Sequence, residues 1–518
     1  MSLPRKYPPP IQPDDWNAMV DRINGLVPTG YFTSPYSFLI ATAVVGGVTY
    51  YYANNAFQTV YGGHNWAVVS PTVNGTDLAA VVQAAINAGS TVVFGDGTFT
   101  FTVAKYSPGD ATYKIGCYLK DNVHVIISKG ATITQANGLK LQVFFAGHLW
   151  GTGSGEQLSG VTFEVYGMID GNYGNQSYTV PDTAFEACPI ALYATKSSFP
   201  IIRAKEFGRY GALVLYGAYN QIGEVYAETS YDVTHHQASG VDLERCEETN
   251  FGRVIGAYLD GRGVQIADGG SNIIIEAINT YNCYGNLLIC VASALAVKGI
   301  SVGKVVSGGH YTSGGYGAIL ITAGDGFGGV SDIAIDSASI SGASDDGIKI
   351  VNFGTPHTAV VRRVTIGSAI LYNNHQHGGD GGLALAHCNN VTIGFLHAYD
   401  DQGVKTQYWG IKLGDEVTGL LINGGSVAGN VDTVDGYTTA KGKILNVVAF
   451  LTMNHGATTG TGARQTIAHG LGATPSYIRF WDYAGNDRAN VYLDLASDTT
   501  NIYPLAVLNK IYLWEAYI

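Results

Sequence analysis

The chain has 518 residues and a formal net charge of −12; 46% of its residues are hydrophobic, only 13% are charged, and 69 are glycine. This balance excludes a disordered chain, which needs few apolar and many charged residues. The negative charge argues against nucleic acid or anionic lipid as a partner and leaves a neutral polysaccharide or a protein surface. Glycines lie between short Val, Ile and Leu runs, which predicts a β-protein with many tight turns.

Residues 1–30 predict a short helix in a segment that attaches the chain to another surface. Over residues 12–25, Pro13 suits the first turn and Gly25 the end, and apolar residues repeat along one side: Trp16, Met19, Val20 and Ile23. A helix this short is marginal alone, so its apolar side must pack on something else. No apolar stretch of the kind found in a signal peptide follows the N-terminus.

Residues 31–70 predict a hairpin that leads into the main body. The apolar run 38–45 is far shorter than the ~20 residues of a membrane-spanning helix. Gly46 and Gly47 end it before a return strand, 48–52. A second helix is predicted over 77–88, with Thr76 as its N-cap and Gly89 at its end, and a buried strand over 91–94 follows it.

A repeat of strands and turns dominates the rest of the chain. An alternating apolar strand follows a glycine at intervals of 22 to 35 residues, at Gly211, Gly240, Gly263, Gly285, Gly317, Gly347, Gly382 and Gly410. Such a period without helices predicts a solenoid whose coils stack on one another. The predicted fold class is all-β, a parallel β-helix over 71–430, followed by a linker, 431–464, and a C-terminal β-domain, 465–518.

The same repeat predicts an apolar strip on the outside of the coils. If the first and third residues after each glycine fill the core, the second and fourth face outward: Leu213, Leu215, Leu287, Ile289, Ile319 and Ile321. An exposed strip of this kind needs a partner to cover it, which favours self-association. The alternatives are that the pleat is inverted or that a loop covers the strip.

Two groups of carboxylates are candidates for chemistry, because equivalent residues on adjacent coils lie about 5 Å apart and glycosidases use carboxyl pairs at about 5 to 9.5 Å. Neighbouring carboxylates repel, so one keeps its proton and can act as the acid while another acts as the base. The first group precedes strands of the second half: Asp345, Asp346 and Asp380, with His375 and His377, as catalytic residues, and Lys349, Asp400 and Asp401 as substrate-binding residues. The alternative is that these aspartates cap turns.

The second group lies on one strand. Asp242 and Glu244 share a face, His235 and His236 precede them, and Asp260 and Arg262 follow on the next coil. Asp242, Glu244 and Asp260 are predicted to be catalytic, with Arg262 binding substrate. The alternatives are a Ca²⁺ site or a surface ion pair with Arg262 or Arg253.

Other residues give weaker signals. Tyr408 and Trp409 are predicted to stack on sugar rings, with packing under a loop as the alternative. The six cysteines have no Cys-x-x-Cys spacing, so they predict buried thiols and no zinc site. No cofactor is predicted beyond the open Ca²⁺ alternative.

Several segments resemble the pectate-lyase-like right-handed β-helix superfamily. Asn74-Gly75-Thr76-Asp77 to Ala88 and then Val92–Phe99 resemble its capping helix and first coil, and Met168–Asn172 resembles an early-coil signature. The resemblance covers residues 71–430 and implies a right-handed β-helix, but it implies no single chemistry, because the superfamily holds lyases, hydrolases and silent proteins.

Two further resemblances bear on function. Asp345 and Asp346, His375 or His377, and Lys405 or Lys412 partly match the polygalacturonase arrangement, although the preceding coil lacks its Asn-x-Asp. Residues 465–475 resemble a small β-sandwich found at the ends of virus tail and fibre proteins. With the N-terminal helix and the β-helix, the chain resembles a virus tailspike, which implies a homotrimer attached to other virion proteins by its N-terminal segment.

Three functions therefore remain open. The first is a virion-surface, extracellular tailspike or fibre protein that recognises a host polysaccharide or glycoprotein, with or without cleaving it. The second is a dedicated polysaccharide hydrolase or, as second choice, a lyase, which would need clustered Lys or Arg against uronate groups. The third is a non-catalytic structural spike. None of them requires nucleic acid or membrane insertion.

Overall fold

The computed structural model describes residues 37–45, 48–55, 76–107, 110–147, 157–178, 187–208, 210–229, 238–291, 293–310, 317–324, 328–353, 360–374, 381–428, 430, 432–438, 440–445, 447–448, 453–459, 461, 463–468, 477–482, 491–497, 501–506 and 511–517. They belong to two compact units, Met1–Tyr311 with Gly326–Gly328, and Thr312–Asp325 with Gly329–Ile518. The predicted helix over 12–25 lies outside the described residues.

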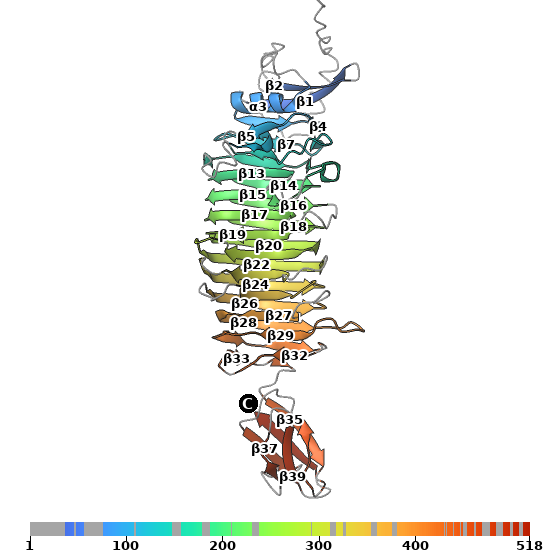
Figure 1. The fold of residues 1–518 in the computed structure, drawn as a ribbon, viewed down its shortest axis with the longest axis vertical. Coiled ribbons are helices and arrows are strands. Elements are labelled where there is room, and N and C mark those ends of the chain that lie inside the picture. The colour runs from blue at the N-terminus through green and yellow to red at the C-terminus, as the bar shows by residue number, and fades with distance from the viewer. Residues whose placement is uncertain are drawn as a thin grey trace, which may run out of the picture. The chain divides into compact units, whose positions relative to one another are not determined.

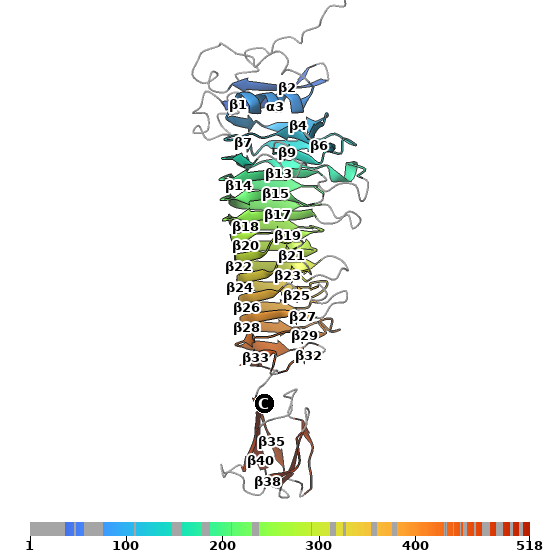
Figure 2. The same ribbon diagram turned by 60° about the vertical axis from the view of Figure 1, so that its left-hand side comes forward.

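The first unit opens with the predicted hairpin and helix. Strands β1 (Ser37–Val45) and β2 (Val48–Asn55) pair antiparallel, with Val45 opposite Val48. Helix α3 (Leu78–Ala88) lies against the hairpin and the first coil (Figures 1 and 2). Its N-cap is Asp77, one residue later than predicted; the Asp77 side chain accepts the N–H of Ala80 at 3.3 Å.

The architecture that follows is the predicted right-handed parallel β-helix. In the first unit, one run of parallel pairs is β13–β15–β17–β19–β21 and another is β14–β16–β18–β20–β22. Its strands after the hairpin, with one 3₁₀ turn η3 (Tyr173–Asn175), are β3 (Thr91–Phe94), β4 (Gly97–Phe101), β5 (Lys105–Ser107), β6 (Asp110–Tyr118), β7 (His124–Ile127), β8 (Ala131–Gln135), β9 (Val143–Ala146), β10 (Leu158–Ser159), β11 (Thr162–Val165), β12 (Met168–Asp170), β13 (Cys188–Thr195), β14 (Ser198–Lys205), β15 (Tyr210–Ala218), β16 (Gln221–Glu228), β17 (Ala238–Glu247), β18 (Asn250–Ala257), β19 (Arg262–Ala267), β20 (Ser271–Cys283), β21 (Gly285–Val291) and β22 (Val297–His310).

The second unit repeats the parallel pattern in β23–β25–β27–β29 and β24–β26–β28. Its parallel strands are β23 (Ile319–Ala323), β24 (Val330–Ser341), β25 (Ile348–Asn352), β26 (Val361–Tyr372), β27 (Gly381–Ala386), β28 (Cys388–Tyr399), β29 (Trp409–Leu413), β30 (Leu420–Ile422), β31 (Gly425–Ala428), β32 (Asp432–Asp435), β33 (Gly442–Ile444) and β34 (Val447–Val448).

The last strands form two small sheets, β35-β40-β37 and β36-β39-β38, with antiparallel pairing. They are β35 (Met453–Thr459), β36 (Ile467–Ala468), β37 (Tyr477–Asp482), β38 (Val491–Leu495), β39 (Asn501–Ala506) and β40 (Ile511–Tyr517). That these sheets pack as a β-sandwich stays a prediction. In the described part of the chain, no helix has the length and apolar character needed to span a membrane.

In each unit the core is filled by columns of aliphatic side chains in register. Leu213, Val241, Val264 and Leu287 pair in sequence on β15, β17, β19 and β21, and each is 0% exposed. In the second unit, Ile319, Ile348, Leu383 and Ile411 form the equivalent column, also at 0%. Neighbouring members of a column are one strand spacing, about 4.8 Å, apart, so each side chain packs directly on the next.

These columns contradict the predicted outer apolar strip. Leu213, Leu215, Leu287, Ile289, Ile319 and Ile321 are all fully buried. The error is one of register: Gly211 lies opposite Ser239 rather than Gly240. Since successive side chains of a strand point to opposite faces, a slip of one residue exchanges inside for outside. The strip therefore gives no support for self-association.

The corners of the first unit share a left-handed backbone conformation. Lys196, Tyr219, Glu248, Asn272 and Gly299 recur at one corner with φ between 47° and 67°. The N–H of Lys196 donates to Ala218 O and that of Tyr219 donates to Glu247 O, so each corner is tied to the next coil. Non-glycine residues pay a steric cost in this conformation, and here the ladder bonds hold them in it.

Candidate active site

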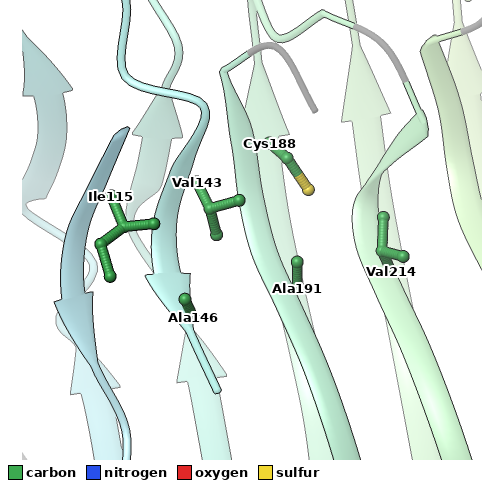
Figure 3. Close-up of a cluster of buried hydrophobic side chains, with 6 residues drawn as sticks. All are labelled: Ile115, Val143, Ala146, Cys188, Ala191 and Val214. Carbon is green, nitrogen blue, oxygen red and sulfur yellow. The ribbon is translucent and has the colours of Figure 1, made fainter. Parts of the chain in front are cut away.

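The outer face of the first unit carries a buried apolar cluster that leads to the acidic pair. Its six members project from β6, β9, β13 and β15 (Figure 3): Ile115, Val143, Ala146, Cys188, Ala191 and Val214, each 0% exposed. Tyr113, Tyr118, Tyr210 and Tyr216 pack against it. Ala146, Ala191, Val214 and Asp242 lie opposite one another in register. The apolar column therefore ends at a carboxyl.

Asp242 and Glu244 lie two residues apart on β17, on either side of the core residue Leu243. Both side chains therefore point to the outer face, as the sequence predicts. Asp242 is 1% exposed, whereas Glu244 is half-buried. Gln265 Nε2 donates to Asp242 Oδ2 at 3.4 Å. Oδ1 of Asp242 is buried and has no hydrogen-bond partner among the described residues.

The two carboxyls differ in how firmly they hold a proton. Burial raises the pKa of Asp242 well above its ordinary range, and the nearby charge of Glu244 raises it further, against the hydrogen bond from Gln265. Burial also raises the pKa of Glu244; a hydrogen bond from Tyr216 opposes this rise and the charge of Asp268 adds to it. The rise in pKa is larger for Asp242 than for Glu244, and two carboxyls whose environments shift their pKa values differently can divide the acid and base roles of catalysis.

Three residues around this pair were missed in the sequence. Tyr216 lies opposite Glu244 on β15 and Gln265 lies opposite Asp242 on β19. Asp268 follows β19 and acts electrostatically on both carboxyls. Counting one coil forward and back from each carboxylate, in the correct register, reaches Tyr216 and Gln265, and Asp268 directly follows Ala267, the partner of Glu244.

Asp260 and Arg262 have other surroundings. Asp260 Oδ1 accepts the N–H of Ala238 at 2.8 Å, so Asp260 fixes the start of β17. Arg262 is 5% exposed, and its guanidinium carbon lies 5.0 Å from the centre of the Tyr284 ring. Arg253, one suggested partner of the acidic pair, is paired with Glu224 instead. His235 and His236 lie outside the described residues.

In the second unit, the first acidic group is an ion-paired turn. Lys349 Nζ lies 3.3 Å from Asp345 Oδ2 and 2.9 Å from Asp346 Oδ2, and both carboxylates are at most 4% exposed. Asp346 Oδ1 accepts the N–H of Gly381 at 2.7 Å. Burial lowers the pKa of Lys349, but Asp346 and Asp345 outweigh it and raise the pKa. These contacts fit a structural clamp between coils. Asp380, His375 and His377 lie outside the described residues.

Asp400 and Asp401 also make turn contacts. Asp400 is 2% exposed, and its carboxylate accepts the N–H groups of Gln402 at 2.9 Å, Thr406 at 2.7 Å and Gln407 at 2.9 Å. Asp401 Oδ1 accepts from Asn373 Nδ2 at 2.7 Å. The structure favours the turn-capping alternative for both residues.

Tyr408 and Trp409 form an aromatic pair on the second unit. Their ring centres lie 4.4 Å apart at 72°, and Tyr408 is 41% exposed. Lys412 Nζ lies 4.4 Å from the centre of the Trp409 ring. A cation thus lies over the Trp409 ring, while Tyr408 is partly exposed to solvent.

The cysteines fit the prediction of buried thiols. Cys117, Cys188, Cys246, Cys283 and Cys388 are buried, Cys290 is partly buried, and all six are free. Burial raises the pKa of Cys290 to about 12, which disfavours its thiolate at neutral pH. Within the described ranges no three His, Cys, Asp or Glu side chains are grouped to hold a metal ion, and the Ca²⁺ alternative stays untested.

No family model and no curated protein matches the chain. Among solved structures, it is similar to the A-module of a mannuronan C-5 epimerase of Azotobacter vinelandii (16% identity, 72% of this chain and 96% of that one, TM-score 0.43). It is also similar to a tailspike protein of E. coli bacteriophage HK620 in complex with a pentasaccharide (11%, 85% and 90%, 0.47). A third is PfbA, a surface adhesin of Streptococcus pneumoniae (13%, 72% and 87%, 0.40).

Proposed function

We propose that the protein binds a surface polysaccharide on the outer face of the first unit and hydrolyses a glycosidic bond with Asp242 and Glu244. The observation that carries this proposal is the acidic pair itself. A buried carboxyl whose pKa is raised well above its ordinary range lies two residues along β17 from a more exposed carboxyl whose pKa is also raised.

In the proposed reaction, Asp242 donates its proton to the glycosidic oxygen as the bond from that oxygen to the sugar carbon breaks. Glu244 accepts a proton from the water whose oxygen bonds to the same carbon. Protons and atoms balance, and Asp242 is re-protonated after product leaves. A substrate must approach from the side of Glu244, because Asp242 itself is almost fully buried.

A second candidate function is recognition without cleavage, which the exposed Tyr408 ring beside Trp409 favours. Aromatic faces of this kind suit pyranose rings, which present an apolar side. On this view the acidic pair would be a structural defect tolerated by the fold. A lyase is disfavoured, because among the residues that the structure describes neither site gathers several cations against a uronate.

For the biological setting, we propose a virion-surface tailspike or fibre protein that acts on host-cell glycan as a homotrimer. The sequence resemblance supports this setting. Exposed apolar residues on the outer strands add to the case for self-association: Ile370 on β26 is 40% exposed and Phe395 on β28 is 48% exposed. The proposed contact with other virion proteins is assigned to residues 1–30.

The test is to incubate the purified protein with purified bacterial capsular and O-antigen polysaccharides, one at a time, and to determine the masses of the products by mass spectrometry. A saturated oligosaccharide of fixed repeat size is expected. Asp242→Asn and Glu244→Gln should each lower the cleavage rate by about 10²–10⁴-fold, while Asp332→Asn in the second unit should not. An unsaturated end would indicate a lyase, and intact glycan that co-sediments with the protein would leave recognition alone.

A further inference from the structure

Strand register places an exposed aromatic residue on the same column as Glu244. Tyr193 on β13 lies opposite Tyr216 on β15, and Tyr216 lies opposite Glu244 on β17. The column continues to Ala267 on β19 and Cys290 on β21. With about 4.8 Å between neighbouring strands, Tyr193 stands about 10 Å from Glu244 along the axis of the coils.

The members of this column differ in size and exposure on the two sides of Glu244. Tyr193 is 39% exposed, whereas Tyr216 is half-buried and hydrogen-bonded to Glu244. On the other side, Ala267 and Cys290 are small. A ligand lying along the column thus contacts aromatic rings on the Tyr193 side of Glu244 and small side chains on the Ala267 side.

We infer that Tyr193 is a sugar-binding subsite, and that the bound glycan runs across the strands from Tyr193 over Glu244 toward Ala267. The inference rests on the proposed function, because it takes Asp242 and Glu244 as the point of cleavage. The Tyr193 ring stacks on the apolar face of a pyranose, as aromatic side chains do with flat apolar surfaces.

An exposed tyrosine away from the Glu244 column should not contribute to glycan binding. Tyr281 on β20 is a suitable control, because it is 54% exposed and belongs to the other run of parallel strands. If exposure alone let a tyrosine bind glycan, Tyr281 would do so as well as Tyr193. The position on the Glu244 column distinguishes the two.

The test measures glycan affinity and cleavage separately. Binding is measured by calorimetry on the Asp242→Asn protein, which does not consume its ligand, with each purified capsular or O-antigen polysaccharide that the parent protein retains. Adding Tyr193→Leu is expected to weaken binding about fivefold, which corresponds to about 1 kcal/mol for a stacked ring. Tyr193→Phe should restore binding, and Tyr281→Leu should not change it.

Cleavage gives a second readout with otherwise native protein. Tyr193→Leu is expected to raise KM for oligosaccharides long enough to reach from Glu244 to Tyr193 and to leave KM for a single repeat unchanged. Equal effects on long and short substrates, or equal effects of Tyr193→Leu and Tyr281→Leu, would overturn the subsite. Binding that depends on Tyr193 without any cleavage would reject the proposed hydrolysis and keep the subsite. A protein that retains none of the polysaccharides would reject both.

Discussion

The buried carboxyl of Asp242 destabilises the folded protein as pH rises. Its pKa in the folded state is raised, mainly by burial. Between the ordinary aspartate value near 3.8 and the raised value, the folded chain therefore holds more protons than the unfolded chain. Stability falls with increasing pH across that window. A residue kept for stability alone would not have this property.

Asp242→Asn should remove this dependence while keeping the shape of the side chain. The variant is expected to gain thermal stability relative to the parent protein as the pH is raised from 5 to 8, and to lose cleavage. Thermal unfolding followed by circular dichroism at several pH values measures the first effect.

Asp332 provides the control. Its hydrogen bond with Arg363 lowers the pKa of this exposed carboxyl to about 2, so Asp332→Asn should show no gain with rising pH. A constant difference between Asp242→Asn and the parent protein at all pH values would contradict the assigned protonation of Asp242.

The ion pairs of Lys349 stabilise the folded protein, whereas the buried carboxyl of Asp242 destabilises it as pH rises. Lys349→Met would leave Asp345 and Asp346 buried without their cation, and removal of one partner from a buried ion pair costs about 3–5 kcal/mol. Urea denaturation should show a lower midpoint and a free energy of unfolding that is smaller by about this amount. Arg363→Met, which breaks an exposed pair with both side chains 47% exposed, should change the midpoint little. Equal effects of the two substitutions would show that the clamp is not structural.

At the scale of strands and corners, the left-handed turns predict which residues each corner accepts. Lys196 is exposed and has φ of 50°. Lys196→Asn should be neutral or slightly stabilising, because asparagine tolerates this conformation. Lys196→Val should destabilise the protein by about 1–2 kcal/mol, because a branched Cβ is strained there. Chemical denaturation of the two variants measures the difference, and equal stability would count against a strained corner.

The sequence predicted the elements better than their faces. The period of glycines and apolar strands was enough for a parallel β-helix, because coil stacking depends on strand content and turn spacing. Which residues point inward depends on one-residue register, and the glycines misled here: Gly211 and Gly240 both lie near the start of a strand, β15 and β17, but one position out of line with each other. The correct faces followed only from strand pairing.

The candidate site shows the same limit. Asp242 and Glu244 were found because both lie on one strand, where alternation alone places them together. Tyr216 and Gln265 come from neighbouring coils, 28 and 23 residues away from their partners Glu244 and Asp242, and no local pattern links such distances. The protonation of Asp242 depends on burial, which requires the packed structure.

At the scale of the whole molecule, the proposed homotrimer predicts the mass of the native protein. Sedimentation equilibrium is expected to give three times the mass of the 54.7 kDa chain. Ile370→Lys with Phe395→Lys should reduce that mass if the exposed apolar residues of the second unit lie between chains, because a buried unpaired lysine opposes association. A native protein of single-chain mass would reject the trimer.

Coil length and strand register are independent in this protein, which has a consequence for how its specificity can change. Glu244 is 28 residues after Tyr216, whereas Ala267 is 23 residues after Glu244, yet all three stand in one column. Residues can therefore be added to or removed from a corner without moving the strands on either side. Evolution or an engineer can lengthen one corner beside the acidic pair to admit a different branch of a polysaccharide, while the carboxyls keep their positions.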